Sequence, residues 1–324
     1  MASTEISLEK LFAGDRRMLS RAITLIESKR ERDHAIAQQL LEQAMPKTGD
    51  SLRIGITGAP GVGKSTLIDT LGMLLVGIGK KLAVLAVDPS SPKSGGSVLG
   101  DKTRMEQLSK QENAFIRPSP SNDSLGGVAQ KTREAMLLCE AAGFDLILIE
   151  TVGVGQSEVD VASMVDFFAV VMLPNAGDEL QGIKRGIIEF ADAVVINKAD
   201  GESVTAAERA RGQFQSALRL IKQSGVWSPR AITCSALKGT NVDELWRLAE
   251  AYREAAKQVG EFELKRSSQN ADWMEKLLRE LIDRRIRERP EVRDTMMRLE
   301  EKVRSGKMTP SAAVSELDEY FQIA

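Results

Sequence analysis

A phosphate-binding loop of the pattern GxxxxGK[ST] is present as Gly58-Ala59-Pro60-Gly61-Val62-Gly63-Lys64-Ser65. Its glycines allow backbone N–H groups to converge on phosphate oxygens, and the N-terminus of a following helix adds positive potential. We expect Lys64 to reach the β- and γ-phosphates and Ser65 to bind Mg²⁺, and Thr66 completes the predicted segment. A glycine-rich turn without a ligand is the alternative, but the apolar run before the loop and the helical pattern after it favour phosphate binding.

A base-reading motif follows the apolar segment 193–196 as Asn197-Lys198-Ala199-Asp200. The Asp200 carboxylate can accept hydrogen bonds from N1–H and the 2-amino group of guanine, whereas adenine has a lone pair at N1 and no 2-amino group. Lys198 can lie along the plane of the base. The predicted guanine site is completed by Ser235-Ala236-Leu237, where the Ala236 N–H would donate to guanine O6 and Leu237 stands where lysine is usual.

A third motif follows the apolar segment 145–149 and reads Glu150-Thr151-Val152-Gly153-Val154-Gly155-Gln156. Glu150 stands where most GTPases carry the aspartate of DxxG, and we expect it to act at the metal and in catalysis with Lys64. Gly153 would give its N–H to the γ-phosphate. Val154 stands where a water-positioning glutamine would be, and Gln156 lies two residues further on. We therefore expect slow intrinsic hydrolysis.

Two further acids belong to a long loop rich in Gly, Ser and Pro, which runs from 88 to 104. Long loops between strong elements are uncommon and often functional. Asp88 and Asp101 are candidate Mg²⁺ ligands or holders of its waters, together with Ser65 and Glu150. The alternative for Asp101 is an N-cap before a helix at 102–110. The sequence does not rank these acids as direct ligands.

These motifs require a sheet to position them, and the sequence alternates accordingly between 52 and about 258. Apolar runs without internal alternation predict strands buried on both faces, and helical patterns separate them. The predicted fold is therefore α/β, a mainly parallel sheet flanked by helices. The expected strands are 52–57, 82–87, 114–117, 145–149, 167–173, 193–196 and 230–234; the expected helices are 64–78, 126–142, 178–190, 203–223 and 241–258.

Helical segments flank this central domain, so we expect a helical extension at 1–50, a nucleotide-binding domain at 51–260 and a helical arm at 261–324. Within the arm, helices are predicted at 268–289 and 291–320, with a second break at 306–310. Apolar side chains from Trp273 to Ile286 follow i, i+4 spacing and need a covering surface. The arm itself is predicted to dimerise; packing on its own domain and a partner protein are the alternatives.

Composition excludes several other classes. The 324 residues carry 44 basic and 46 acidic side chains, a net charge of −2 that argues against nucleic-acid binding. No apolar run is long enough to span a bilayer, so no membrane association is expected. The start of the chain lacks a signal-peptide core and is rich in acids. The chain has one histidine, His34, and two cysteines that lie far apart, Cys139 and Cys234. This composition argues against catalysis by His or Cys side chains. We expect a cytoplasmic protein.

Together, GAPGVGKST, VDPSSPKSGGSVLGDKTRM, ETVGVGQSE, NKAD and SAL resemble the P-loop GTPases of the SIMIBI class that carry Glu in the third motif. Within that group the sequence is most similar to the MeaB-type (ArgK-type) GTPase chaperones of adenosylcobalamin-dependent methylmalonyl-CoA mutase. The resemblance covers essentially the whole chain. The stretch DPSSP–SGGS–LGDKTRM is particularly specific to this branch of the group. No residue by itself indicates cobalamin.

The resemblance implies a homodimeric GTPase that binds GTP or GDP with Mg²⁺ and docks on the mutase, with the cobalamin adenosyltransferase as a further partner. Hydrolysis would gate loading of adenosylcobalamin, which belongs to the mutase, and help to remove damaged cofactor. The segment 174–186 corresponds to an additional switch in the family, so Asp178 and Lys184 become candidate catalytic residues. Capping of the following helix is the alternative for Asp178.

Three rival functions remain. A nickel-insertion GTPase of the same group would usually carry His-rich or Cys-containing metal sites, which this chain lacks. A P-loop small-molecule kinase needs an acceptor pocket but no NKxD motif. A structural scaffold would hold GTP without turnover, and stimulation of hydrolysis by a partner would exclude it.

Overall fold

The structure is a computed structural model, and it describes residues 6–88, 105–120, 127–151, 157–174, 185–221 and 225–318. The chain divides into two compact units, Met1–Ser267 and Ser268–Ala324. Each unit is described by itself below.

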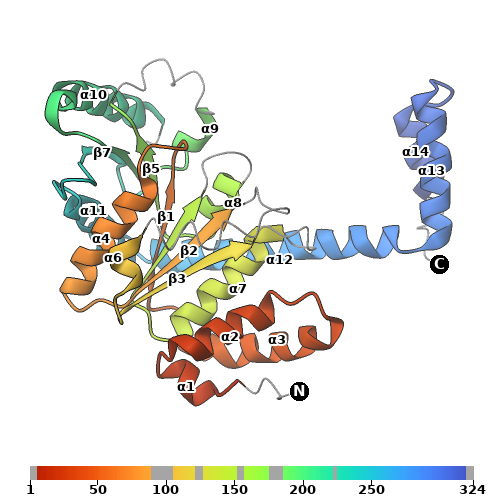
Figure 1. Ribbon diagram of the computed structural model, residues 1–324. Coiled ribbons are helices and arrows are strands. Elements are labelled where there is room, and N and C mark those ends of the chain that lie inside the picture. The colour runs from red at the N-terminus through yellow and green to blue at the C-terminus, as the bar shows by residue number, and fades with distance from the viewer. Residues whose placement is uncertain are drawn as a thin grey trace. The chain divides into compact units, whose positions relative to one another are not determined.

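The first unit is built on a seven-stranded sheet in the order β3-β2-β4-β1-β5-β6-β7 (Figure 1). All neighbouring strands are parallel. The three central strands are buried throughout, as expected for apolar runs covered on both faces. The strands are β1 Leu52–Thr57, β2 Leu82–Asp88, β3 Ala114–Pro120, β4 Leu146–Thr151, β5 Phe167–Met172, β6 Ala193–Ile196 and β7 Arg230–Thr233. The mainly parallel α/β sheet predicted from the sequence is thus confirmed.

The register of the sheet brings the sequence motifs to one edge. β1 lies between β4 and β5, with Ile56 opposite Glu150 and Thr57 opposite Val170. The phosphate loop leaves the carboxyl end of β1, the third motif leaves that of β4, and the base-reading motif leaves that of β6. Ligands bind at this edge in open parallel sheets.

One face of the sheet is covered by α4 Lys64–Gly77, α6 Glu106–Ser109 and α11 Asp243–Gln258. On α4, the apolar side chains of Leu67, Ile68, Leu71 and Leu75 are buried against the strands. Asp69 on the same helix accepts a hydrogen bond from the Leu108 N–H of α6 at 2.9 Å. The helix that starts at the phosphate loop is therefore fixed to its neighbours along its length.

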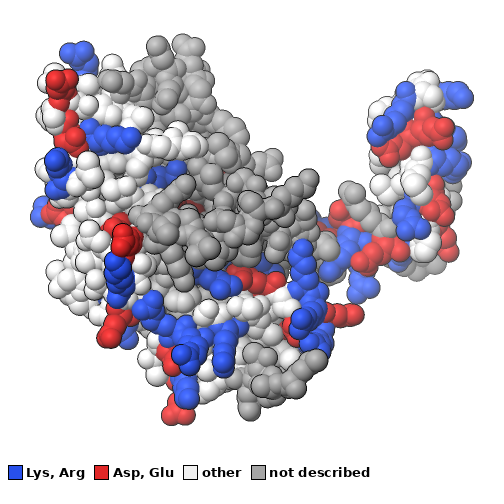
Figure 2. Space-filling view, viewed as in Figure 1, with Lys and Arg blue, Asp and Glu red and all other residues white. Residues whose placement is uncertain are grey.

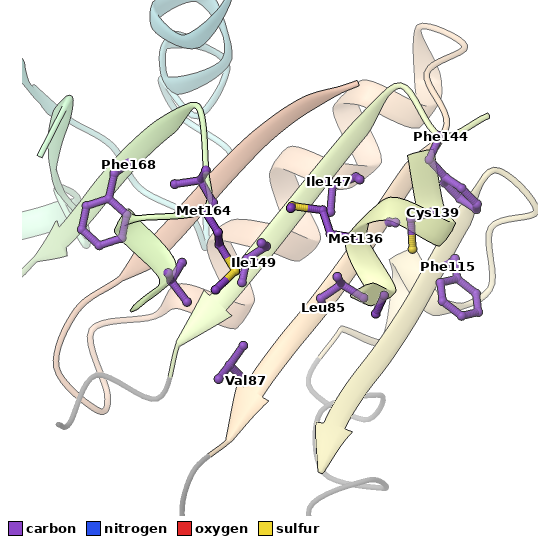
Figure 3. Packing of buried hydrophobic residues seen from close by; sticks show 14 of the residues in the cluster. Leu85, Val87, Phe115, Met136, Cys139, Phe144, Ile147, Ile149, Met164 and Phe168 are labelled. Atoms are coloured by element: carbon purple, nitrogen blue, oxygen red, sulfur yellow. The ribbon is translucent and has the colours of Figure 1, made fainter. Parts of the chain in front are cut away.

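The opposite face is covered by α7 Gly127–Ala141, α8 Ser157–Ala162, α9 Arg185–Ile188 and α10 Val204–Ile221, and the short η3 Gly201–Ser203 precedes α10. Figure 3 shows Met136 and Cys139 of α7 lying against side chains of the neighbouring strands, among them Ile147. Both cysteines of the chain, Cys139 and Cys234, are buried free thiols. Burial raises the pKa of the Cys139 thiol above its ordinary value.

A helical extension precedes the sheet, as predicted for 1–50: α1 Leu8–Phe12, α2 Arg16–Ile26, α3 Glu31–Ala44 and η1 Met45–Lys47. Asp15 caps α2 by accepting the Met18 N–H at 2.8 Å. The apolar side of α2 joins the core beneath α7. An ion pair between Glu27 and Arg117 connects α2 with the edge strand β3.

Buried charged groups gather at the amino ends of the strands. Asp166, just before β5, accepts hydrogen bonds from Arg266 Nε and Nη2, each at 2.7 Å, and from the Arg53 N–H at 2.8 Å. Arg266 also donates to the carbonyls of Gly49 and Ser51, and the Arg53 guanidinium pairs with Glu140 at 2.7 Å. We call these charged groups, Arg53, Glu140, Asp166 and Arg266, the amino-end network.

The network includes a residue of the long helix α12 Glu261–Arg287, which begins directly after Gly260. The expected helix at 268–289 therefore starts seven residues earlier than the sequence predicted. Phe262 is buried in the sheet core, and Lys265 Nζ donates to the Asp166 carbonyl. Tertiary contacts of this kind, rather than an amphipathic pattern, stabilise the first turns of α12. Residues 261–267 accordingly belong to the first unit.

The second unit contains the rest of α12 with α13 Pro290–Arg304 and α14 Pro310–Asp318. The predicted break at 306–310 is present, with Gly306 at φ +69° and Pro310 starting α14. Figure 2 shows basic and acidic side chains interleaved on these helices. In the part of α12 that belongs to the second unit, the exposed large apolar residues are Met274, Leu278, Leu281 and Ile282. No helix in the described ranges is long and apolar enough to cross a bilayer.

Candidate active site

The phosphate loop occupies residues 58–63 between β1 and α4, as the sequence predicted. Gly58, Gly61 and Gly63 have φ of +148°, +82° and +94°. A Cβ on Gly58 would lie 2.3 Å from the Val171 carbonyl oxygen. The loop therefore requires glycine for both backbone conformation and space, and it leads directly into the N-terminus of a fourteen-residue helix.

Lys64 begins that helix and folds back over the loop. Its Nζ donates to the carbonyls of Gly58 at 2.7 Å and Ala59 at 3.1 Å, and the side chain is buried. Pro60, Gly61 and Thr66 are exposed. A buried ammonium among exposed loop residues places a cation where phosphate oxygens would approach.

Ser65 lies against the third motif. Its hydroxyl donates to Glu150 Oε1 at 2.8 Å, and the Glu150 carboxylate, at the carboxyl end of β4, is buried. The structure thus brings together two of the four oxygen groups predicted for a metal. Asp88 ends β2, with only its backbone described, and Asp101 lies outside the described residues.

Asn197 connects the base-reading motif to the phosphate loop. Its Nδ2 donates to the Val62 carbonyl at 2.8 Å, and its Oδ1 accepts the Ala236 N–H at 3.0 Å. The Cys234 thiol lies 3.6 Å from the same oxygen, and burial raises the pKa of this thiol to about 12, which keeps it a neutral donor. A Cβ on Gly63 would lie 2.5 Å from Asn197 Nδ2, so the two motifs pack directly against each other.

Asp200 is held by the loop that follows β7. The Ser235 hydroxyl donates to Asp200 Oδ2 and accepts the Lys238 N–H at 3.2 Å. Lys198 has a positive φ of +60° and an exposed side chain, which leaves its stem accessible to a flat ligand. The backbone thus fixes a carboxylate and a long cation side by side, next to the phosphate loop.

The Ala236–Leu237 segment differs from the expectation in one detail. The Ala236 N–H, predicted to donate to guanine O6, donates to Asn197 Oδ1 here, and Ala236 is buried. Leu237 is 77% exposed and is the outermost residue of the predicted triplet.

Four predicted site residues, Asp101, Gly153, Asp178 and Lys184, lie outside the described residues, as do Val154 and Gln156. The expected helix at 178–190 is described only as α9 Arg185–Ile188, and the expected helix at 102–110 only as α6 Glu106–Ser109. The proposals for these positions stay predictions.

Sequence reasoning missed three polar contacts beside the site. The Thr151 hydroxyl donates to the Thr57 hydroxyl at 2.7 Å, and Thr57 Oγ1 lies 3.5 Å from a buried carboxylate oxygen of Glu158. Thr70 on α4 donates to the Ala236 carbonyl at 2.8 Å. None of the three has a local sequence signal, because the partners come from separate elements.

The assembled groups suit a nucleoside triphosphate. A glycine loop and Lys64 would meet phosphates, Ser65 and Glu150 would offer oxygen ligands, and Asp200 with Lys198 would meet a base. Asn197 fixes the distance between the phosphate and base halves through two backbone contacts. Cleavage of a terminal phosphate then needs only positioning and charge stabilisation.

Comparison with known proteins agrees with this site. Residues 19–291 match the family described as "Methylmalonyl Co-A mutase-associated GTPase MeaB". The chain is 44% identical to GTPase ArgK of Escherichia coli over 98% of this chain and 96% of that one. It is 46% identical to the mouse "Methylmalonic aciduria type A homolog, mitochondrial" over 96% of this chain and 78% of the relative.

A solved structure agrees with the fold over nearly the whole chain. The crystal structure of a "LAO/AO transport system kinase" has a TM-score of 0.81 and 38% identity, covering 98% of this chain and 96% of that chain. The family match covers most of the chain, and the relatives match it almost from end to end. The chain therefore belongs to the MeaB family of methylmalonyl-CoA mutase-associated GTPases.

Proposed function

We propose that this GTPase uses guanine nucleotide binding and hydrolysis to control the cofactor state of methylmalonyl-CoA mutase. The part of the proposal that concerns the nucleotide rests on one observation: the Asn197 side chain hydrogen-bonds both to the phosphate loop and to the Ala236 N–H. Asp200, held by Ser235, then reads the N1–H and 2-amino group of guanine. Lys198 lies along the base.

Mg²⁺ is proposed as the companion of the nucleotide. The Ser65 hydroxyl and the Glu150 carboxylate offer hard oxygen donors 2.8 Å apart, which suits this cation. Asp88 and Asp101 are further candidates to hold it or its waters. When bound, the ion neutralises charge that develops on the β- and γ-phosphate oxygens. Lys64 contributes a second positive charge at the same oxygens.

Slow intrinsic hydrolysis is proposed because Val154 stands where a water-positioning glutamine would be. Docking on the mutase would bring Lys184, with Asp178, toward the nucleotide. A cation there offsets charge on the transferring phosphoryl group. GTP hydrolysis would gate adenosylcobalamin loading and help to remove damaged cofactor, and the cobalamin adenosyltransferase would be a further partner.

A homodimer formed through the second unit is also proposed. Four large apolar side chains in the second-unit part of α12 are exposed within one chain: Met274, Leu278, Leu281 and Ile282. Apolar side chains gathered on a helix are usually covered in the working assembly. We propose a cytoplasmic location for this dimer and its mutase partner.

Replacement of Asp200 by asparagine tests the guanine assignment. Asp200→Asn should weaken GTP binding and favour xanthosine triphosphate, because the donor–acceptor pattern at the 2-position of the base inverts. Dissociation constants of GTP, ATP and the xanthine nucleotide measure this. Wild-type protein that binds ATP as tightly as GTP would contradict the assignment.

Mutase-dependent turnover tests the partner. Hydrolysis at saturating mutase should exceed basal hydrolysis, and Lys184→Ala should reduce the stimulated rate while leaving nucleotide affinity nearly unchanged. Lys110→Ala is the matched control, since Lys110 pairs only with Glu106 on the exposed side of α6 among the described contacts. Equal stimulation of Lys184→Ala and wild type would refute the role of Lys184. Hydrolysis that requires an added acceptor would favour a kinase instead.

A further inference from the structure

Both backbone groups of Ala236 are engaged in the structure. Its N–H donates to Asn197 Oδ1 at 3.0 Å, and its carbonyl accepts the Thr70 hydroxyl at 2.8 Å. Asn197 belongs to the base-reading motif, whereas Thr70 belongs to no motif and lies on α4, five residues after Ser65. The helix that begins at the phosphate loop thus also holds the loop after β7.

The loop after β7 is closed on itself at its base. Ser235 and Thr240 exchange two backbone hydrogen bonds, of 3.0 and 3.1 Å. The Thr70 methyl group lies near Gly239, since a Cβ built there would be 3.8 Å from it. Thr70 therefore meets the tip of the loop from the α4 side with both its hydroxyl and its methyl group.

The geometry of a peptide bond gives this contact a consequence for the ligand. The Ala236 carbonyl and the Leu237 N–H belong to one planar trans peptide, so they point in opposite directions. Anchoring the carbonyl on α4 turns the Leu237 N–H away from α4. Leu237 itself is the exposed residue of the triplet.

We propose that Thr70 is a positioning residue for base selectivity, which orients the Ala236–Leu237 peptide so that its N–H meets an acceptor at position 6 of the purine. Guanine has the acceptor O6 there, whereas a 6-aminopurine presents donors. Selection at position 6 is then supported from α4, while Asp200 selects at N1 and at position 2. The proposal rests on the guanine site proposed above.

The test compares three nucleotides on one set of variants. GTP and inosine triphosphate differ at position 2. GTP and 2-aminoadenosine triphosphate differ at position 6 and also at N1, where the second has no proton for Asp200. Because Asp200 is the same in every variant of Thr70, the N1 difference cancels when their preferences are compared. Thr70→Val removes the hydroxyl and keeps the branched shape. We expect it to reduce the preference for GTP over 2-aminoadenosine triphosphate about tenfold, the factor that corresponds to one hydrogen bond. The preference for GTP over inosine triphosphate should not change.

Further variants separate positioning from a loss of folding. Thr70→Ser should restore the wild-type preference, and Thr70→Ala should behave as Thr70→Val, so either variant can decide if the valine protein does not fold. Thr24→Val is the matched control, because the Thr24 hydroxyl donates to the Ser20 carbonyl at 2.8 Å and accepts from Arg117 Nη2 at 3.4 Å, both outside the sequence motifs of the site. It should keep both preferences.

Each outcome decides between the two proposals. An unchanged preference at position 6 in Thr70→Val and Thr70→Ala, or equal losses at positions 6 and 2, would overturn the role of Thr70. A wild-type protein that ignores the 2-amino group, or an Asp200→Asn variant with unaltered selectivity, would instead overturn the guanine site itself, and the role of Thr70 with it.

Discussion

Removal of the Arg266 guanidinium should destabilise the nucleotide-binding unit although Arg266 lies in the first turns of α12. Burial acts to lower the pKa of Arg266, but hydrogen bonding to Asp166 and the charges of Asp166, Glu140 and Glu263 raise it overall, so the group stays charged. Its four hydrogen bonds reach the Asp166 carboxylate and the carbonyls of Gly49 and Ser51. Asp166 is only 1% exposed.

The variant Arg266→Met keeps an apolar stem but removes the guanidinium, whose Cζ lies 4.6 Å from the centre of the Phe262 ring, and leaves a buried carboxylate without its partner. Breaking a buried pair in this way costs about 3–5 kcal/mol. We expect a value near the lower end, about 3 kcal/mol, because the Arg53 N–H still donates to Asp166 and water can reach the partly exposed position. At about 2–4 °C per kcal/mol for a unit of this size, the midpoint of unfolding should fall by about 6–12 °C.

Thermal unfolding followed by tryptophan fluorescence measures the effect, since Trp227 and Trp246 belong to the first unit. Arg247→Met is the matched control: its charged head is exposed on α11, where pairs with Asp243 and Glu244 contribute about 0.3–0.5 kcal/mol. Equal midpoints for the two variants would refute the reasoning. GTP hydrolysis by folded Arg266→Met should match wild type, because the amino-end network lies at the edge of the sheet opposite the nucleotide site.

Three further changes test other parts of the molecule. A chain ending at Ser267 should sediment as a monomer where the full chain sediments as a dimer; a shortened chain that remains dimeric would exclude the second unit as the interface. Glu150→Ala should raise the Mg²⁺ concentration for half-maximal turnover by about 10- to 100-fold, and an unchanged requirement would remove Glu150 from the metal site. Burial raises the pKa of Glu27 although Arg117 and Lys131 act to lower it, so its contribution to stability is present in acid and is lost as pH rises above the ordinary value of 4.5 through the folded pKa. Glu27→Gln should therefore flatten the pH dependence of the unfolding free energy in that range, and parallel urea-unfolding curves for variant and wild type would contradict this.

The sequence predicts the sheet well because its strands are buried on both faces and read as unbroken apolar runs. The expected strands 52–57 and 193–196 coincide with β1 and β6. The expected strand 114–117 stops short of β3, which continues to Pro120 because it pairs with β2 as far as Asp88. Such an extension depends on a neighbouring strand, which local composition does not reveal.

The motifs of the site were also predictable, since each is a short contiguous segment at a strand end. The groups that position them were not. Thr70 and Ala236 are 166 residues apart in the sequence. The contacts of Arg266 with Gly49 and Ser51 could not be predicted either, because these partners are more than 200 residues apart. A start of α12 at Glu261 could not be predicted either, because its first turns are stabilised by the buried Phe262 and by Arg266.

The two buried thiols determine how this protein can be labelled. Cys139 and Cys234 are fully enclosed, and burial raises the pKa of both, so neither supplies much thiolate, the form that attacks maleimides and similar reagents. One cysteine introduced on each unit would therefore carry fluorophores or spin labels without removal of the native pair. Distances between such labels would test whether the separation of the two units changes when guanine nucleotide is added.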